Sequence, residues 1–183
     1  MKAQRRFVAL FRGINVGRAK RLAMADLRAL LQSLGYGGVR TLLNSGNAVF
    51  DAPTAATAAS HAQRIRAAVA EQLGVDALLI VKPAADIAAA VAGNPLAGQG
   101  LNPSSLLVAL TQDAASLQAL CGLAGGDWGE EALLIGAHAA YLHCPMGLME
   151  SRLALALLRE LAESGTTRNW ATLEKINALL VEP

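Results

Sequence analysis

Residues 7–17 read FVALFRGINVG and decide the fold, because a buried strand runs there directly into a glycine-punctuated loop. Phe7–Phe11 is an apolar run rich in strand-forming residues, which predicts a buried β-strand. A helix is expected from Ala23 to Leu34, since apolar side chains recur there at helical spacing. The chain therefore opens with a strand, a loop and a helix.

The order of elements in the first half matches a ferredoxin-like unit. Two strands, Val39–Leu43 and Ala48–Phe50, are separated by the hairpin-turn sequence Asn44-Ser45-Gly46-Asn47. A helix over His61–Leu73 and a strand over Ala77–Val81 complete the order strand, helix, strand, strand, helix, strand.

The second half repeats most of this order. Turn residues are densest between Gly93 and Pro103, so we expect two domains, 1–93 and 94–183. Beyond a short helix at 86–92, the expected elements are a strand at 106–110, a helix at 113–120, hairpin strands at 133–135 and 140–143, and helices at 148–162 and 170–180. The predicted fold class is α+β, with two ferredoxin-like (βαββα-type) subdomains, mainly antiparallel sheets and an extra C-terminal helix.

Composition excludes several classes of protein. Of the 183 residues 54% are hydrophobic and 16% charged, which is not the composition of a disordered chain. No uncharged apolar run reaches the 18 residues that a membrane span needs. Two cysteines, Cys121 and Cys144, without a Cys-x-x-Cys spacing indicate a reducing compartment and no disulfide framework. Both are expected to be buried, and the protein is expected to be cytoplasmic.

Charge is divided unevenly along the chain. Residues 1–66 carry eleven Lys or Arg and two Asp, a net of +9, whereas residues 67–183 have a net of −7. Such asymmetry is consistent with an anionic partner for the basic part, either a small molecule or nucleic acid. Attraction between the two halves and a head-to-tail homodimer remain alternative explanations.

Topology places two polar segments at one edge of the first sheet. The loop after the first strand (Arg12, Gly13, Asn15) and the turn between the second and third strands (Ser45, Gly46, Asn47) end at the same side of a ferredoxin-like sheet. The first helix begins at this edge too, and its free N–H groups favour an anion.

Each of these residues also has a structural interpretation. The glycines can supply positive φ angles, and Asn and Ser are common turn formers. Arg12 can pair with an acid such as Asp51. A third polar cluster, Thr166–Trp170, includes Arg168, Asn169 and Trp170, which can clamp a ligand or cap and pack the last helix. The sequence does not place this cluster relative to the first edge.

Known motifs for other chemistries are absent. There is no P-loop, the Gly13-x-Asn15-x-Gly17 spacing is not a dinucleotide fingerprint, and the three histidines lack the spacing of metal ligands. No Ser-His-Asp set stands out, and one aromatic in Ser45–Phe50 weakens comparison with RNA-recognition domains. We therefore expect no metal and no cofactor.

Three separated motifs resemble the domain of unknown function 1697 family. They are Arg12-Gly13-Ile14-Asn15-Val16-Gly17, Ser45-Gly46-Asn47-Ala48-Val49-Phe50, and Thr167-Arg168-Asn169-Trp170 with Thr172 and Lys175. The resemblance covers essentially the whole chain and departs from the family pattern at Asn44 and Ala171. It implies two ferredoxin-like subdomains in a bacterial protein, and it implies no activity, so no catalytic residue is carried over.

Three functions follow as hypotheses. The first is a binding protein for a phosphate-bearing ligand at the Arg12–Asn15 and Ser45–Asn47 edge, with Arg168 as a further candidate contact. The second is a structural or protein-interaction scaffold whose polar motifs lock the subdomains together. The third is an enzyme using the same edge, for which the motifs offer no carboxylate, His or Cys as a general base.

Overall fold

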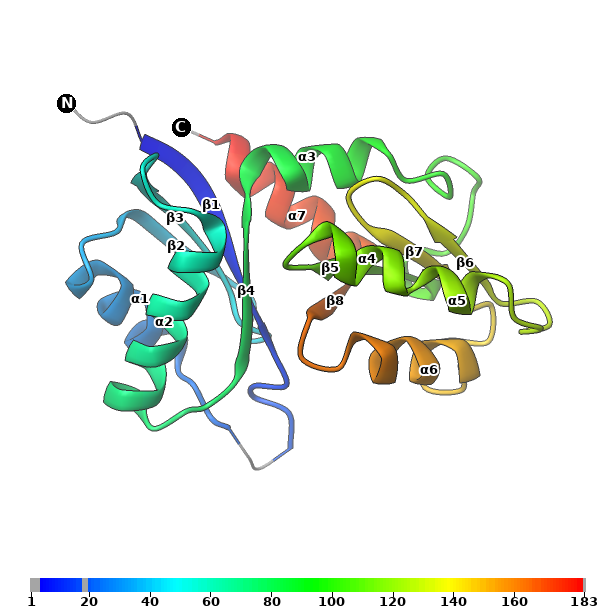
Figure 1. Ribbon diagram of the computed structural model, residues 1–183, viewed down its shortest axis with the longest axis horizontal. Coiled ribbons are helices and arrows are strands. Elements are labelled where there is room, and N and C mark those ends of the chain that lie inside the picture. Colours follow the sequence, from blue (N-terminus) through cyan, green and yellow to red (C-terminus); the bar gives the residue numbers. More distant parts are fainter. Residues whose placement is uncertain (1–3, 18–19, 183) are drawn as a thin grey trace. The chain divides into compact units, whose positions relative to one another are not determined.

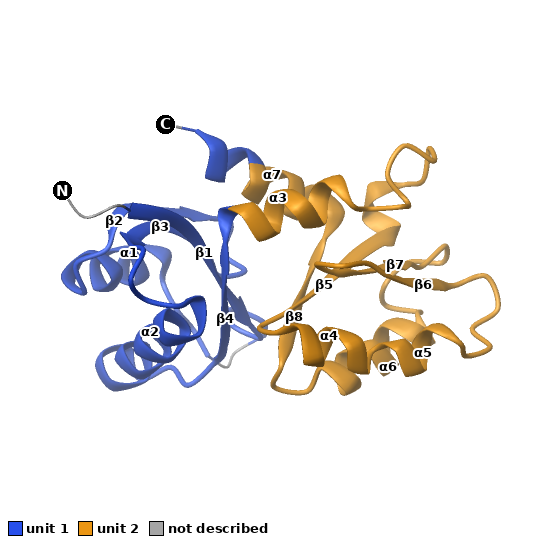
Figure 2. Cartoon of the chain, turned by 45° about the horizontal axis from the view of Figure 1, so that its top comes forward, with its two compact units in different colours: residues 1–84, 178–183 blue, residues 85–177 orange. Residues whose placement is uncertain are grey.

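The computed structural model describes residues 4–17 and 20–182 (Figure 1). Lys2 and Arg18, which contribute to the basic half, lie outside the described residues. The chain forms two compact units (Figure 2). Unit 1 comprises Met1–Ala84 with Ala178–Pro183, and unit 2 comprises Ala85–Asn177.

Unit 1 is a four-stranded antiparallel sheet with the strand order β2-β3-β1-β4. Its elements are β1 (Gln4–Arg12), α1 (Met24–Ser33), β2 (Gly37–Leu42), β3 (Asn47–Pro53), α2 (Ala58–Leu73) and β4 (Leu78–Pro83). The central strand β1 pairs with β3 through Phe7–Phe50 and with β4 through Arg12–Leu78. This is the ferredoxin-like order expected from the sequence.

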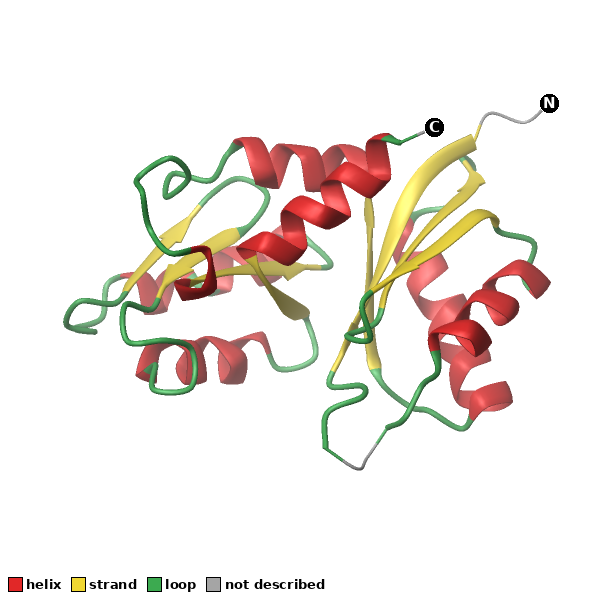
Figure 3. Cartoon of the chain, turned by 180° about the vertical axis from the view of Figure 1, so that it is seen from behind, coloured by secondary structure: helices red, strands yellow, loops and turns green. Residues whose placement is uncertain are grey.

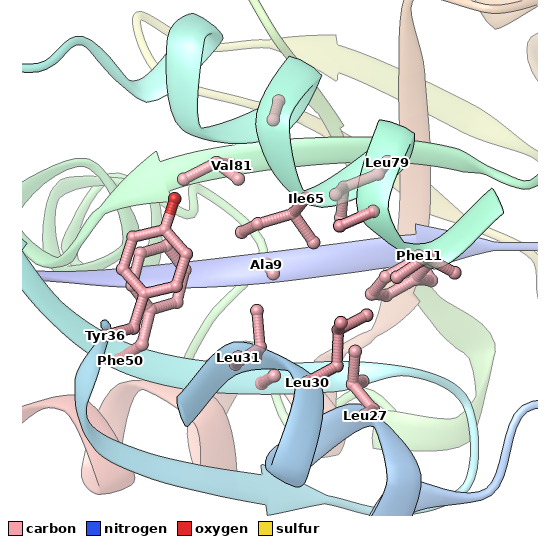
Figure 4. Packing of buried hydrophobic residues seen from close by; sticks show 14 of the residues in the cluster. Ala9, Phe11, Leu27, Leu30, Leu31, Tyr36, Phe50, Ile65, Leu79 and Val81 are labelled. Atoms are coloured by element: carbon pink, nitrogen blue, oxygen red, sulfur yellow. The ribbon is translucent and has the colours of Figure 1, made fainter. Parts of the chain in front are cut away.

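The core of unit 1 lies between one face of this sheet and the helices α1 and α2 (Figure 4). Alternate residues of β1, including Ala9 and Phe11, enter this core because successive side chains of a strand point to opposite faces. Leu31 of α1 and Ile65 of α2 are fully buried against them. Side chains at helical spacing on α1 and α2 thus cover the sheet, as their sequences predict.

Unit 2 has a second antiparallel sheet with the equivalent order β6-β7-β5-β8. Its elements are α3 (Ala84–Ala92, from Ala85 on), a short 3-10 turn η1 (Pro103–Ser105), β5 (Leu106–Thr111), α4 (Ala114–Ala119), α5 (Cys121–Ala124), β6 (Ala132–Ile135), β7 (Ala140–His143), α6 (Arg152–Leu161), β8 (Gly165–Asn169) and α7 (Trp170–Val181, up to Asn177). Within unit 2, α4, α5 and α6 lie on one face of the sheet and α3 and α7 on the other, as the labels of Figure 2 show; Figure 3 gives the same helices and strands from behind. Leu117, Leu142 and Leu157 belong to the core on the α4–α6 side.

The strand β8 was not expected from the sequence. The segment Gly165–Asn169 has no apolar side chain, so its pattern did not indicate a buried strand. In the structure it pairs with β5 from Leu107–Asn169 to Thr111–Gly165 and completes the second ferredoxin-like unit. The second half therefore contains the full order of six elements before its last helix.

The helix expected at 148–162 begins later than predicted. It starts at Arg152, because the Ser151 side chain accepts a hydrogen bond from the Ala154 N–H at 2.8 Å and so caps its first turn. Residues 145–150 form turns instead, with Gly147 at a φ of +92°.

The two units differ from the expected ranges 1–93 and 94–183 at two places. The helix α3 belongs mainly to unit 2, where the Tyr141 hydroxyl of β7 donates to the Ala90 carbonyl at 2.7 Å. The last residues of the chain belong to unit 1, where the Arg40 guanidinium donates to the Leu179 carbonyl at 2.7 Å and lies 2.8 Å from the Glu182 carboxylate.

Candidate functional site

The loop after β1 and the β2–β3 turn meet at one edge of unit 1, as the topology predicts. The Phe11 N–H donates to the Gly46 carbonyl at 2.9 Å, and the Asn15 side-chain amide donates to the Asn44 carbonyl at 2.8 Å. The turn itself is shifted by one residue from the expected 44–47, because Asn47 already pairs with Leu10 as the first residue of β3. Two segments about thirty residues apart thus form one continuous surface.

Asn15 holds the loop after β1 in place. Its backbone is left-handed, with a φ of +56°, a conformation that Asn adopts more readily than most residues. Its side-chain amide donates to the Leu22 carbonyl at 2.8 Å, and its side-chain oxygen accepts from the Leu22 N–H at 2.9 Å. With the bond to Asn44, every polar group of this side chain has a protein partner, so Asn15 shapes the edge.

The β2–β3 turn is fixed by Gly46 and Asn47. Gly46 has a φ of +81°, and a Cβ at this position would lie 2.5 Å from Ile14 Cδ1 and 2.7 Å from Phe11 Cβ. Asn47 is buried, and its amide donates to the Leu42 carbonyl at 2.8 Å and to the Ser45 hydroxyl at 3.0 Å. The Ser-Gly-Asn motif therefore builds a tight turn that only glycine at its centre permits.

Arg12 and Gly13 stand at the end of β1. Arg12 is half-buried, and burial lowers the pKa of its guanidinium from the usual value, although it keeps its positive charge at neutral pH. Asp51, the expected partner of Arg12, instead lies opposite Arg6, four residues after the start of β3 at Asn47, and its carboxylate is 3.0 Å from the Arg6 Nε. Gly13 is exposed with a φ of +69°.

A pocket of about 320 Å³ opens at this edge beside the start of α1. Its lining includes Asn15 and Asn44 together with Arg21, Leu22 and Ala23. Ala23 is the N-cap residue of α1, and among residues 4–17 and 20–182 no side chain caps the first N–H groups of this helix. Uncapped N–H groups at a helix N-terminus carry partial positive charge and point toward an incoming anion.

Arg21 and Ala23 line the pocket but are not among the site residues predicted from the sequence. Two features of the sequence point to them. Arg21 stands two residues before the predicted helix, and the N-cap position holds an alanine, where Ser, Thr, Asp or Asn is usual. Arg21 and the uncapped helix start together give the lining positive charge, and Asp26 in the first turn of α1 is not among the described lining residues.

The third polar cluster lies in unit 2, in β8 and at the start of α7. Arg168 is buried, its guanidinium donates to the Thr166 hydroxyl at 3.0 Å and to the Thr167 carbonyl at 2.7 Å, and burial lowers its pKa to about 10. The Asn169 side chain accepts from the Thr172 N–H at 2.8 Å and so caps α7, and Trp170 is buried. These residues belong to a different unit from the edge around Asn15.

The two cysteines differ in burial. Cys144 is buried, which raises the pKa of its thiol, whereas Cys121 is exposed, contrary to expectation. Among the described residues no group of three or more His, Cys, Asp or Glu side chains is placed to hold a metal ion. In the same residues no helix is both long and apolar enough to cross a membrane.

The strand orders and helices of the two units define a protein of two ferredoxin-like α+β units with an additional C-terminal helix. The chain belongs to the family described as Protein of unknown function (DUF1697), whose model matches residues 4–141. This confirms the resemblance to the family, with the first two motifs inside the matched residues and the third, Thr167–Trp170, beyond them.

A solved structure supports the same fold. The chain is similar to the conserved bacterial protein SP0830 from Streptococcus pneumoniae, with a TM-score of 0.79, 23% sequence identity, and coverage of 97% of this chain and 99% of that chain. No curated protein matches the sequence.

Proposed function

We propose that unit 1 binds a phosphate-bearing ligand, a nucleotide or nucleic acid, at the edge formed by the Arg12–Asn15 loop and the Ser45–Asn47 turn. The observation that carries the proposal is the pocket at the uncapped start of α1, with Arg21 in its lining. Free helical N–H groups and a guanidinium together suit the oxygens of a phosphate group.

The charge of unit 1 favours the same ligand. Residues 1–84 and 178–183 contain twelve Lys or Arg and five Asp or Glu, a net of +7, whereas residues 85–177 have a net of −5. A positive field of this kind attracts anions and raises their local concentration. Steep weakening of binding by salt is therefore expected.

The residues of the motifs have different roles in this proposal. Asn15 and Asn47 form the walls of the edge, since their amides are engaged by backbone carbonyls. Ligand contacts come from the N–H groups at the start of α1 and from Arg21, with Arg12 adding positive charge at the end of β1. None of the described residues that line the pocket is aromatic, so recognition rests on phosphate and not on stacking of a base.

A thermal-shift assay with tripolyphosphate, a mononucleotide and a short oligonucleotide tests the proposal. We expect a ligand-induced rise in melting temperature at low salt that diminishes at moderate salt and disappears in Arg21→Ala. Arg28→Ala is the matched control, because Arg28 is an exposed arginine on α1, away from the described lining of the pocket, and donates to the Thr41 hydroxyl. A flat screen contradicts the proposal, as do equal losses in the two variants, which would indicate only a general effect of charge.

The second candidate is a structural or protein-interaction scaffold. It is favoured by the use of the motif side chains of Asn15, Asn47 and Asn169 in caps and turns. On this account, substitutions in the motifs lower stability and no anion binds.

An enzyme using this edge is the third candidate and the least supported. The described residues that line the pocket include no carboxylate, His or Cys to act as a general base, and Asp51 is paired with Arg6.

A further inference from the structure

His61 lies in the core of unit 1, on α2, with 4% of its surface exposed. Three aromatic rings surround it: the ring centroids of Phe7, Tyr36 and Phe50 lie 5.0, 5.4 and 5.8 Å from its own, each in an edge-on arrangement. Its Nδ1 is 3.0 Å from the Tyr36 hydroxyl. Its Nε2 is buried, and no described residue forms a hydrogen bond with it.

The charged and titratable groups around His61 do not stabilise a positive charge on its ring. The segment before β2 presents Tyr36, α2 itself presents Arg64, and β1 and β3 present the rings of Phe7 and Phe50. Arg64 stands 5.4 Å from the centroid of the Tyr36 ring. Burial first, and then the like charge of Arg64, lower the pKa of His61, whereas burial raises the pKa of the Tyr36 hydroxyl.

Protonation of this ring leaves a buried donor without an acceptor. An imidazolium has two N–H donors whichever tautomer the neutral ring adopts, and only the Nδ1 side faces a hydrogen-bonding partner. The second donor would lie among apolar side chains, with a cationic guanidinium as its charged neighbour. Both the unsatisfied donor and the buried charge disfavour the folded state.

We infer that His61 is a proton-sensitive switch in the core of unit 1, which holds α2 on β1 and β3 when neutral and loosens this packing when protonated. The unfolded chain takes up a proton at its His61 position at about pH 6.5, before the folded core does. The unfolded state thus binds more protons below this pH, and the stability of unit 1 decreases as the pH falls. The inference does not depend on any ligand.

Equilibrium unfolding of the full chain between pH 5 and pH 8 tests this inference. We expect the wild-type melting temperature to fall by several degrees on acidification. His61→Phe should abolish most of this pH dependence, since Phe fills the ring position and does not titrate. His138→Gln is the matched control, because His138 is exposed, and it should leave the pH dependence unchanged. Equal pH dependence in wild type and His61→Phe overturns the inference.

A second measurement needs no variant. NMR titration of the histidine rings in the wild-type protein should show the His61 ring remaining neutral below pH 6.5, the ordinary value for an imidazole. Protection against amide hydrogen exchange, after correction for the slower intrinsic exchange at low pH, should fall first in α2 and β1 on acidification. A His61 ring that titrates near pH 6.5, with unchanged protection in these elements, contradicts the switch.

Discussion

The two ferredoxin-like units differ at the N-terminus of the helix that follows their first strand. In unit 2 the helix after the first strand, α4, is capped by Asp113, whose carboxylate accepts from the Ser116 N–H at 2.8 Å. In unit 1 the equivalent helix, α1, begins at Met24 after the N-cap residue Ala23, receives no side-chain cap from the described residues, and has Arg21 beside its start. In unit 2 a carboxylate caps the helix, whereas in unit 1 the only acidic residue described in the first turn of α1 is Asp26, which does not cap its first N–H groups.

The turns at this edge differ as well. In unit 1 the β2–β3 turn is fastened to the loop after β1 through Asn15 and Asn44. In unit 2 the β6–β7 turn closes on itself, with the Gly136 N–H donating to the Ala139 carbonyl at 2.8 Å. Strand order alone therefore does not create the pocket, which requires the polar motifs of unit 1.

The largest expected effect is from Gly46→Val. The new side chain would occupy the space of Ile14 and Phe11 at a left-handed φ, so we expect a loss of at least about 3 kcal/mol of unfolding free energy. Chemical denaturation measures it, and Gly13→Ala is the control: Gly13 has a similar φ and open space around its Cβ position, so about 1–2 kcal/mol is expected. Similar losses in the two variants would show that packing against Gly46 does not hold the edge.

An intermediate effect is expected from Asn15→Asp. The carboxylate retains the acceptor for the Leu22 N–H but loses the amide donor to the Leu22 and Asn44 carbonyls, which should cost about 2 kcal/mol. Asn44→Asp makes the same change of charge at the same edge, where only the Asn44 backbone carbonyl is used, and should be near neutral in denaturant unfolding. Equal stability of the two variants would show that the Asn15 amide does not stabilise this edge.

The smallest expected effect is from Ala23→Asp, which gives α1 the kind of cap that α4 already has. It should raise the unfolding free energy by about 0.5–1 kcal/mol and weaken binding of tripolyphosphate, because the new carboxylate occupies the helix N-terminus. The reciprocal change Asp113→Ala should lower stability by about 1 kcal/mol without affecting that binding. Unchanged phosphate affinity in Ala23→Asp would argue against an anion at α1.

Much of the fold could be predicted from the sequence, since apolar periodicity marked most strands and helices and topology then brought the Arg12–Asn15 loop to the Ser45–Asn47 turn. The strand β8 could not be predicted, because Gly165–Asn169 is polar and takes its strand conformation from pairing with β5. Local pattern carries no information on such a tertiary pairing.

The candidate site was predictable in its location but not in its chemistry. The sequence placed Asn15 among the ligand contacts, whereas the structure engages its amide with Leu22 and Asn44. That arrangement depends on the left-handed backbone of Asn15, which residue type alone does not establish. Arg21 lies outside the motifs, and only the position of the helix start brings it into the pocket.

The most direct test of the central claim is an NMR titration of the amide resonances of the full chain with tripolyphosphate, in wild type and Arg21→Ala. We predict saturable shifts in wild type at the first amides of α1, Met24, Ala25 and Asp26, that are strongly reduced in Arg21→Ala. The amides of Ala114–Ser116 in α4 should not respond, because Asp113 already caps that helix. Shifts that are absent at α1, or equal at α1 and α4, would contradict an anion site built from the open start of this helix.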